Sequence, residues 1–425
     1  FCSLYPFIVI NEILQNADDC EYSEQVEPNF SLQINGNQII VSYNEVGFTN
    51  SNVRAITAIG ESTKKLLLLN NEKELIGKKG VGFKSIFGVA KAVEIHSNGF
   101  DFILTDKAPT VPKKCEPLNS RKKGTTLIFE MKTDIGEIID KNKILKLCLC
   151  LRNLKRINIQ GIEVYINDRL NTREIQIDNA SYKFELIEYK FELPTKIVEE
   201  YRQHSKIVNK KQIIRCYIPQ NNKMQKYPLY VGLPTQVECN VSLVIDAPFE
   251  LTTARENVLR SDWNNMVRKA VYETILKIME EEKRKMGINI FSFVKFSTFD
   301  NEFELNEFSE SYLNEFDLVG MLKVLKLLPV LKSQKFVTPV EETCYIVPDI
   351  VAYIFRETNV VNKFDGVIID TYKNSKHTRL FQAIGCYKSD IEEEIELVKS
   401  VAEEMIKNDM FREMLYDYLY KVQSE

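Results

Sequence analysis

Two segments near the start of the chain alternate apolar and polar residues around an Asn-Gly turn, and they restrict the fold more than any other feature. Residues 30–43 alternate on either side of Asn35-Gly36-Asn37, and residues 93–104 alternate around Asn98-Gly99. Because Asn-Gly readily adopts the backbone angles of a tight turn, each segment predicts a β-hairpin. Residues 125–131 predict a further strand. With a helical pattern before and between these strands, we expect an α/β sandwich on an antiparallel sheet.

The pattern changes twice along the 425 residues, which is more chain than one hydrophobic core usually supports. A helical stretch from residue 141 is followed by a long amphipathic helix beginning near Ser261. Between them we expect strands at 162–166, 182–193, 212–218 and 238–245. Beyond 286 the sequence is acidic, Phe-rich and irregular, and it closes with amphipathic helical patterns at 389–423. The fold class is therefore expected to be α+β, with an N-terminal domain at 1–132, a second α/β domain at 133–285 and a mostly helical region at 286–425.

Composition and charge argue against several classes of protein. The chain is 44% hydrophobic and 27% charged, as soluble globular proteins are. Its 56 Lys and Arg against 60 Asp and Glu leave a net charge of -4, so nothing in the overall charge supports a nucleic-acid partner. No apolar run approaches the about 20 residues that span a bilayer, and no signal-peptide pattern opens the chain. We expect a cytoplasmic protein without a membrane partner, whose apolar, uncapped start predicts a first helix beginning upstream.

Cysteine and histidine are poorly arranged for metal or nucleophilic chemistry. The nine cysteines are scattered without a paired metal-ligand spacing, and the three histidines are far apart along the chain. Cys148 and Cys150 stand in an apolar run, so we expect small core side chains there rather than zinc ligands. The sequence therefore predicts reduced thiols, and a histidine-rich metal centre or a serine triad loses support.

A polar stripe runs along the first predicted helix. Glu12 and Asn16 are four residues apart and Asp19 is three further, so the three side chains share one face. A carboxylate that polarises water, followed one turn later by an amide oxygen that completes the shell of Mg²⁺, suits phosphoryl chemistry. An ordinary solvated helix face is the alternative interpretation.

A glycine-rich turn precedes a short apolar segment. Gly77, Gly80 and Gly82 fall within six residues and are followed by Phe83. Glycine lets backbone amides approach a phosphate, and the positive end of a following helix favours the anion. No Gly-Lys-Ser/Thr closes the turn and no strand leads into it, so neither a Walker motif nor a dinucleotide fold is predicted.

Taken in order, these motifs and the later Gly124-Thr125 resemble the nucleotide-binding boxes of the GHKL ATPases. The resemblance implies a Bergerat fold that binds ATP and Mg²⁺, with Glu12 as general base and Asn16 as the Mg²⁺ ligand. It places Asp19 beside the adenine, the glycine turn under the phosphates and Thr125 near the base. The nucleotide-binding residues so implied are Asn16, Asp19, Asn44, Gly47, Ser62, Thr63, Lys64, Gly77, Lys79, Gly80, Val81, Gly82, Phe83 and Thr125.

Within that superfamily the first third of the chain is most similar to sacsin-type and NO VEIN-type proteins. The similarity lies in residues 14–19, 44–49 and 59–64. Most members of the superfamily carry an aspartate that accepts a hydrogen bond from the adenine amino group, whereas this chain has Asn44 in the corresponding stretch. An asparagine side chain can both accept and donate, so Asn44 is the candidate adenine reader.

Two further segments carry expectations from the same resemblance. Residues 50–76 would form a lid, with Gly60 as hinge and Ser62-Thr63-Lys64 facing phosphates; a surface helix is the alternative for the leucines at 66–69. Far downstream, Arg255 matches an arginine that reaches the γ-phosphate from the middle domain and that stabilises the transition state. A surface ion pair with Glu256 is the alternative for Arg255.

We therefore expect an ATP-hydrolysing module that drives conformational change, chaperone-like or part of a bacterial stress or anti-phage system by family analogy. We also expect a protein partner or a second copy to bind through the distal regions. The alternative is an interaction protein that holds ATP as a latch without turnover. A histidine kinase is disfavoured because no phospho-acceptor histidine helix precedes the boxes, and a DNA-processing enzyme because basic surface is scarce.

Overall fold

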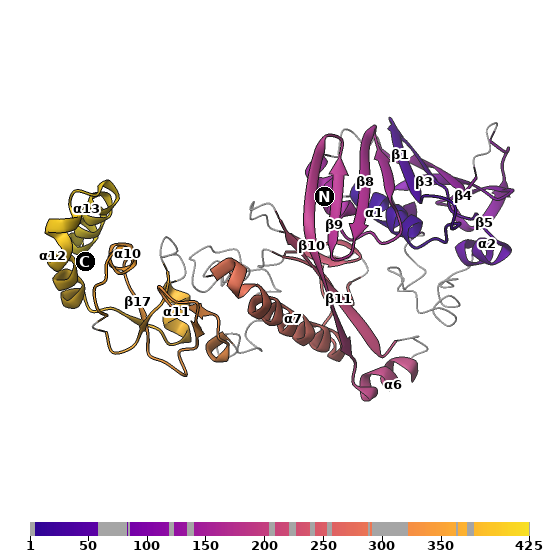
Figure 1. Ribbon diagram of the computed structural model, residues 1–425. Coiled ribbons are helices and arrows are strands. Elements are labelled where there is room, and N and C mark those ends of the chain that lie inside the picture. The colour runs from indigo at the N-terminus through magenta and orange to yellow at the C-terminus, as the bar shows by residue number, and fades with distance from the viewer. Residues whose placement is uncertain are drawn as a thin grey trace. The chain divides into compact units, whose positions relative to one another are not determined.

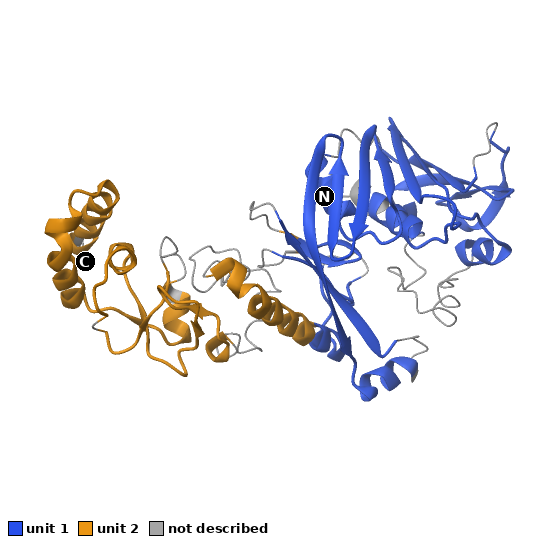
Figure 2. Cartoon of the chain, viewed as in Figure 1, with its two compact units in different colours: residues 1–224, 228–236, 243–267 blue, residues 225–227, 237–242, 268–425 orange. Residues whose placement is uncertain are grey.

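The computed structural model describes residues 5–57, 83, 86–118, 123–133, 140–203, 209–220, 227–238, 243–252, 257–287, 290, 322–362, 364–371 and 378–424. They form two compact units (Figure 2). The first comprises residues 1–224, 228–236 and 243–267, and the second comprises 225–227, 237–242 and 268–425. None of the helices in the described ranges is long and apolar enough to cross a membrane.

A 14-stranded mixed sheet dominates the fold, in the order β13-β12-β14-β11-β10-β9-β8-β7-β1-β2-β6-β3-β4-β5 (Figure 1). The strands are β1 Asn29–Asn35, β2 Gln38–Tyr43, β3 Ala90–Ser97, β4 Phe100–Thr105, β5 Ala108–Lys114, β6 Thr125–Met131, β7 Arg156–Ile159, β8 Ile162–Arg169, β9 Thr172–Ile177, β10 Ala180–Glu192, β11 Lys211–Pro219, β12 Pro228–Val231, β13 Leu233–Glu238 and β14 Val244–Asp246. The expected α+β class is confirmed at this coarse level, and the sheet is mixed rather than wholly antiparallel because β1 pairs with β7 in parallel.

Both hairpins expected from the sequence are present. β1 pairs antiparallel with β2 from Phe30↔Tyr43 to Asn35↔Gln38, and β3 pairs with β4 as far as Ser97↔Phe100. The second turn places Asn98 at φ 47° and Gly99 at φ 85°, the left-handed angles that such a turn requires. The expected strand at 125–131 is β6, which lies between β2 and β3 and joins the two hairpins into one sheet.

The helices of the first unit are α1 Tyr5–Asp18, α2 Asn50–Thr57, α5 Lys141–Cys148 and α6 Thr195–Gln203, with a 3-10 turn at Ile86–Gly88. The apolar side of α1 is fully buried at Ile10, Leu14 and Ala17. Cys148 and Cys150 are also fully buried, which confirms the expectation of core side chains there. The helix expected near Ser261 is α7, Asp262–Met286.

The C-terminal part combines helices with short strands. Its helices are α10 Asp349–Glu357, α11 Thr378–Ile384, α12 Ile391–Met405 and α13 Asp409–Ser424, and its strands are β15 Leu328–Pro329, β16 Phe336–Val337, β17 Cys344–Ile346, β18 Val367–Ile368 and β19 Tyr387–Lys388. One face of α10 packs against α12 and α13 around Ile354 and Phe411, which are both fully buried. Strands of two or three residues are too short to show alternation, so the only individual elements predicted here were the amphipathic helices at 389–423, which correspond to α12 and α13.

The sheet continues past the expected boundary at residue 132. Leu32 of β1 pairs with Ile159 of β7, so a strand before the boundary is hydrogen-bonded to a strand after it. Residues 133–224 belong to the same compact unit as the N-terminal hairpins.

Candidate functional site

The polar stripe of α1 stands on a firmly anchored helix. Ile13, Leu14 and Ala17 are at most 1% exposed, whereas Glu12 and Asn16 on the other side are half-buried. The helical hydrogen bonding continues one residue beyond α1: the Asp19 amide donates to the Gln15 carbonyl at 3.0 Å. A fixed helix with polar groups on its partly open side can hold an oxygen ligand and a carboxylate in constant geometry.

Asp18 has a different role from its neighbours in the stripe. Its carboxylate is fully buried and accepts from the amides of Arg152, Asn153 and Leu154 at 2.9 Å in each case. Burial raises the pKa of the Asp18 carboxyl, while the three amide hydrogen bonds lower it, and the balance is upward. Asp18 therefore fastens the end of α1 to the segment that follows α5.

A second polar cluster lies where β2, β6 and β3 end side by side. Thr125 is the register partner of both Tyr43 and Ser97, and its hydroxyl donates to the buried Glu45 carboxylate. Ser97 Oγ lies 2.5 Å from Thr125 Oγ1. Since the Thr125 proton points to Glu45, Ser97 donates to Thr125 and accepts from the Phe48 amide at 2.8 Å. The Gly47 amide completes the network by donating to Glu45 Oε2 at 2.7 Å.

The carboxylate at the centre of this cluster is electrostatically perturbed. Desolvation by burial raises the pKa of Glu45, and the hydrogen bonds from Thr125 and Gly47 only partly offset it. Glu45 is 6% exposed and Thr125 is 2% exposed. A buried carboxylate that keeps unused lone pairs is a strong acceptor for a ligand N–H.

Two glycines allow the strand ends to come this close. A side chain at Gly124 would place its Cβ 2.1 Å from the Tyr43 carbonyl oxygen, and one at Gly47 would place it 2.7 Å from Asn98 Cβ. Both glycines also have positive φ, at 105° and 91°. Gly124 and Gly47 are therefore required by backbone angle and by space, which is the physical basis of their place in the sequence motifs.

The end of α1 lies beside the second cluster. The Val46 amide donates to the Glu21 carbonyl at 3.0 Å, which ties the turn after α1 to the turn after β2. Burial raises the pKa of the Tyr22 hydroxyl, with further contributions from Cys20, Asp18 and Glu45. The structure thus brings the turn that follows Asp19 next to the turn that contains Gly47, which is hydrogen-bonded through Glu45 to Thr125.

The side-chain amide of Asn44, the candidate adenine reader, is hydrogen-bonded at both ends. Its Oδ1 accepts from the Asn29 amide at 2.8 Å, and its Nδ2 donates to the Glu27 carbonyl at 2.9 Å. Both ends of the Asn44 amide are therefore hydrogen-bonded to the backbone that leads into β1. These bonds stabilise the start of the β1–β2 hairpin. Glu45, the next residue, is the one that meets Thr125.

Several predicted residues lie outside the described part of the chain, so the structure neither gathers nor separates them. They are Ser62, Thr63, Lys64, Gly77, Lys79, Gly80, Val81, Gly82 and Arg255. Phe83 is described, and its ring lies 6.5 Å from that of Phe129 on β6. The described part of the site therefore comprises α1 and the ends of β2, β3 and β6.

Three residues of this site were missed from the sequence: Asp18, Glu45 and Ser97. A carboxylate in an exposed-looking turn gives no sign of burial by itself. The available signal was the continued alternation after β2, since Tyr43 and Glu45 are both buried whereas Asn44 and Val46 are not.

Comparison with known proteins gives one relationship to report. No protein-family model matches the chain. A stretch of 93 residues, 22% of the chain, is 50% identical to Protein NO VEIN of Arabidopsis thaliana, and this stretch covers 3% of that protein. The expected similarity to NO VEIN-type proteins is thereby confirmed for 93 residues of this chain.

Proposed function

We propose that the chain binds ATP with Mg²⁺ and hydrolyses it, with the adenine held at Glu45 and Thr125. The observation that carries the proposal is the hydrogen bond from the Thr125 hydroxyl to the buried Glu45 carboxylate. The resemblance assigns Thr125 to the base. The stretch around Asn44 lacks the aspartate that accepts a hydrogen bond from adenine in most members of the superfamily. Glu45 supplies this acceptor at the adjacent strand end.

Glu45 suits adenine better than guanine. The exocyclic amine of adenine donates hydrogen bonds, and a carboxylate only accepts them. Guanine presents a carbonyl oxygen at the same place, which would face the Glu45 carboxylate without a donor between them. Two buried acceptors that face each other without a donor cost free energy, so Glu45 should favour ATP over GTP. Because Asn44 is engaged with the backbone, we assign adenine recognition to Glu45.

The phosphate end of the proposed site begins on α1. Asn16 contributes an oxygen to Mg²⁺, and Glu12, one turn earlier on the same face, draws a proton from the attacking water. The resemblance assigns phosphate-binding amides to the glycine turn with Gly77, Gly80 and Gly82, a lid to the segment with Lys64 and a γ-phosphate contact to Arg255, and these assignments lie outside the described residues. The proposed output is a conformational change that is transmitted to a protein partner or a second copy.

Equilibrium titration of the full chain with ATP and Mg²⁺ tests the proposal. Thr125→Val removes the hydroxyl at the base and should weaken ATP binding by about 10-fold, the effect of one lost hydrogen bond. Thr126→Val is the matched control, because Thr126 is the next residue on β6 and bonds to Ser42 at 3.1 Å on the other face. Equal affinities of the two variants would place the base elsewhere.

The metal end is tested separately. Asn16→Ala should abolish the Mg²⁺ dependence of ATP binding, because the metal loses its protein oxygen while alanine preserves the helix. Unchanged Mg²⁺-dependent affinity in the folded variant would contradict the assignment. A phosphate-release assay on the unmodified chain then separates an ATPase from a latch, which would bind ATP with the same site and release no phosphate.

A further inference from the structure

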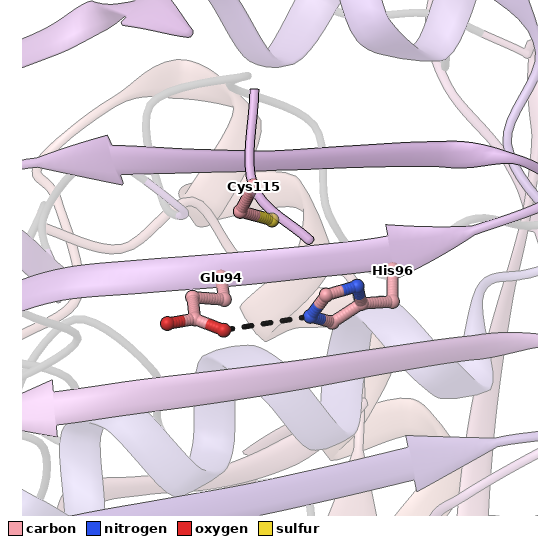
Figure 3. A group of neighbouring side chains, drawn as sticks. All are labelled: Glu94, His96 and Cys115. Carbon is pink, nitrogen blue, oxygen red and sulfur yellow. Dashed lines mark ion pairs between the residues drawn. The ribbon is translucent and has the colours of Figure 1, made fainter. Parts of the chain in front are cut away.

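A group of potential metal ligands lies on β3 and just after β5, away from the proposed nucleotide site. Figure 3 shows Glu94 and His96 facing each other, with Cys115 beside them. The donor atoms of the three side chains all lie within 4.8 Å of one another. Glu94 and His96 are two apart on β3, so they share one face of the strand. Cys115 reaches them across β4, because Asp101 on β4 is the register partner of His96 and its carbonyl accepts from the Cys115 amide at 3.2 Å.

The imidazole of His96 is prepared as a ligand. His96 is 6% exposed, and its Nδ1 lies 3.0 Å from Asp101 Oδ1. A carboxylate accepts hydrogen bonds, so Nδ1 carries the proton and Nε2 presents its lone pair. A carboxylate that orients a histidine in this way is the usual outer partner of a metal-bound imidazole.

His96 Nε2 faces the Glu94 carboxylate and forms an ion pair with it only if the imidazole is protonated (Figure 3). This atom is buried and makes no hydrogen bond among the described residues, and the Glu94 Oε2 atom lies 3.5 Å away. Within the described part of the chain the buried ring nitrogen is therefore left without a hydrogen bond, which needs an explanation, while the Glu94 carboxylate beside it is half-exposed. A cation between Glu94 Oε2, His96 Nε2 and Cys115 Sγ would satisfy all three.

We propose that Glu94, His96 and Cys115 bind Zn²⁺, with Asp101 as the positioning residue. One carboxylate oxygen, one imidazole nitrogen and one thiolate are all ligands that zinc accepts, and water takes the fourth tetrahedral position. A tetrahedral zinc requires donor atoms roughly 3.5 Å apart, as its bond lengths imply. The Glu94 side chain is 43% exposed, so it is free to move the short distance that closes the site.

This site is distinct from the proposed Mg²⁺ position. Successive residues of a strand face opposite sides, so His96 points away from the side on which Ser97 meets Thr125. The zinc would connect β3 to Cys115, the residue after β5. Strand β5 lies at the edge of the sheet, and none of its side chains is buried. The proposed role of the zinc is to fasten this edge, and it does not depend on ATP binding.

Cobalt substitution of the full chain tests the site. After chelation and dialysis, one equivalent of Co²⁺ should give the absorption of a tetrahedral thiolate complex, and Zn²⁺ should displace it. Cys115→Ser should remove the thiolate-to-cobalt band, and Glu94→Gln, a change at a half-exposed position, should weaken binding. Asp101→Asn should lower the affinity by about 10- to 100-fold, as loss of an outer partner does.

Cys20→Ser is the matched control, because Cys20 and Cys115 are both half-buried free cysteines. This variant should keep the full cobalt spectrum. The thermal midpoint of the unmodified chain should rise with Zn²⁺ and that of Cys115→Ser should not, since a ligand stabilises only the folded state that binds it. Absence of the thiolate band, or its persistence in Cys115→Ser, would overturn the proposal in favour of a histidine that pairs only with Glu94 and Asp101.

Discussion

Glu45 is the residue on which base recognition depends in this account. The resemblance placed Thr125 near the base and made Asn44 the candidate adenine reader, whereas we propose that Glu45 accepts a hydrogen bond from the base. The difference arises because hydrogen bonds to the backbone of Glu27 and Asn29 engage the Asn44 amide. Such capping contacts depend on tertiary structure, so the spacing of a motif does not reveal them.

Replacement of Glu45 by glutamine should reduce nucleotide selectivity. Glu45→Gln substitutes a neutral amide that offers a donor as well as an acceptor, so ATP affinity should fall by roughly 10-fold or more, and GTP should be tolerated better. Titrations with both nucleotides measure the ratio of the two affinities. An unchanged ratio would show that Glu45 does not contact the base.

The same carboxylate predicts a pH dependence of stability. Burial raises the pKa of Glu45 in the folded chain, so its favourable contribution is complete below the unfolded pKa and is lost as the pH rises through the folded pKa. Glu45→Gln, which resembles the protonated form, should therefore be more stable than the unmodified chain at neutral pH. The difference should shrink in acid. Denaturant midpoints at both pH values measure it, and a less stable variant at neutral pH would contradict the account.

At the scale of elements, local patterns were sufficient where strands pair with sequence neighbours. The hairpins β1–β2 and β3–β4 and the helices α7 and α12 were predicted from alternation, turn residues and amphipathic spacing. β5 was missed because Pro109 and Pro112 argue against a strand. Proline is tolerated only where no partner needs the amide, and β5 is an edge strand. The parallel pairing of β1 with β7 joins distant segments and has no local signal.

The connection between α1 and the segment after α5 depends on Asp18. Asp18→Ala should destabilise the fold by about 3 kcal/mol, because three buried amides lose their acceptor. Asp18→Asn, which retains one oxygen, should cost less. Asp106→Ala, which removes a partly exposed ion pair with Lys132, is the control and should change stability much less than Asp18→Ala. Equal effects of Asp18→Ala and Asp106→Ala in chemical denaturation would contradict the proposed role of Asp18 in fastening α1.

At the scale of the whole molecule, the continuous sheet limits how the proposed reach of Arg255 to the nucleotide from the middle domain can be tested. A chain cut near residue 132 would lose β7, the partner of β1, and the amides that Asp18 binds. Such a fragment would test folding rather than this reach. A point substitution in the full chain is therefore the better test of Arg255.

Arg255→Ala should leave ATP affinity close to that of the unmodified chain and slow turnover sharply, since the arginine is proposed to act only in the transition state. Arg260→Ala, at an exposed position nearby in the sequence, is the control and should change neither quantity. If Arg255 forms only a surface ion pair, its loss should change stability by no more than about 1 kcal/mol and leave turnover intact.

Glu12 carries the central claim that ATP is hydrolysed at α1. The direct measurement is phosphate release from the full chain with saturating ATP and Mg²⁺, comparing the unmodified protein with Glu12→Ala and with Glu24→Ala, an exposed control. The account predicts that Glu12→Ala still binds ATP but releases phosphate about 10²-fold or more slowly, as expected for a lost general base, while Glu24→Ala is unaffected. Phosphate release by Glu12→Ala at the unmodified rate, or ATP binding by the unmodified chain without any phosphate release, would contradict it.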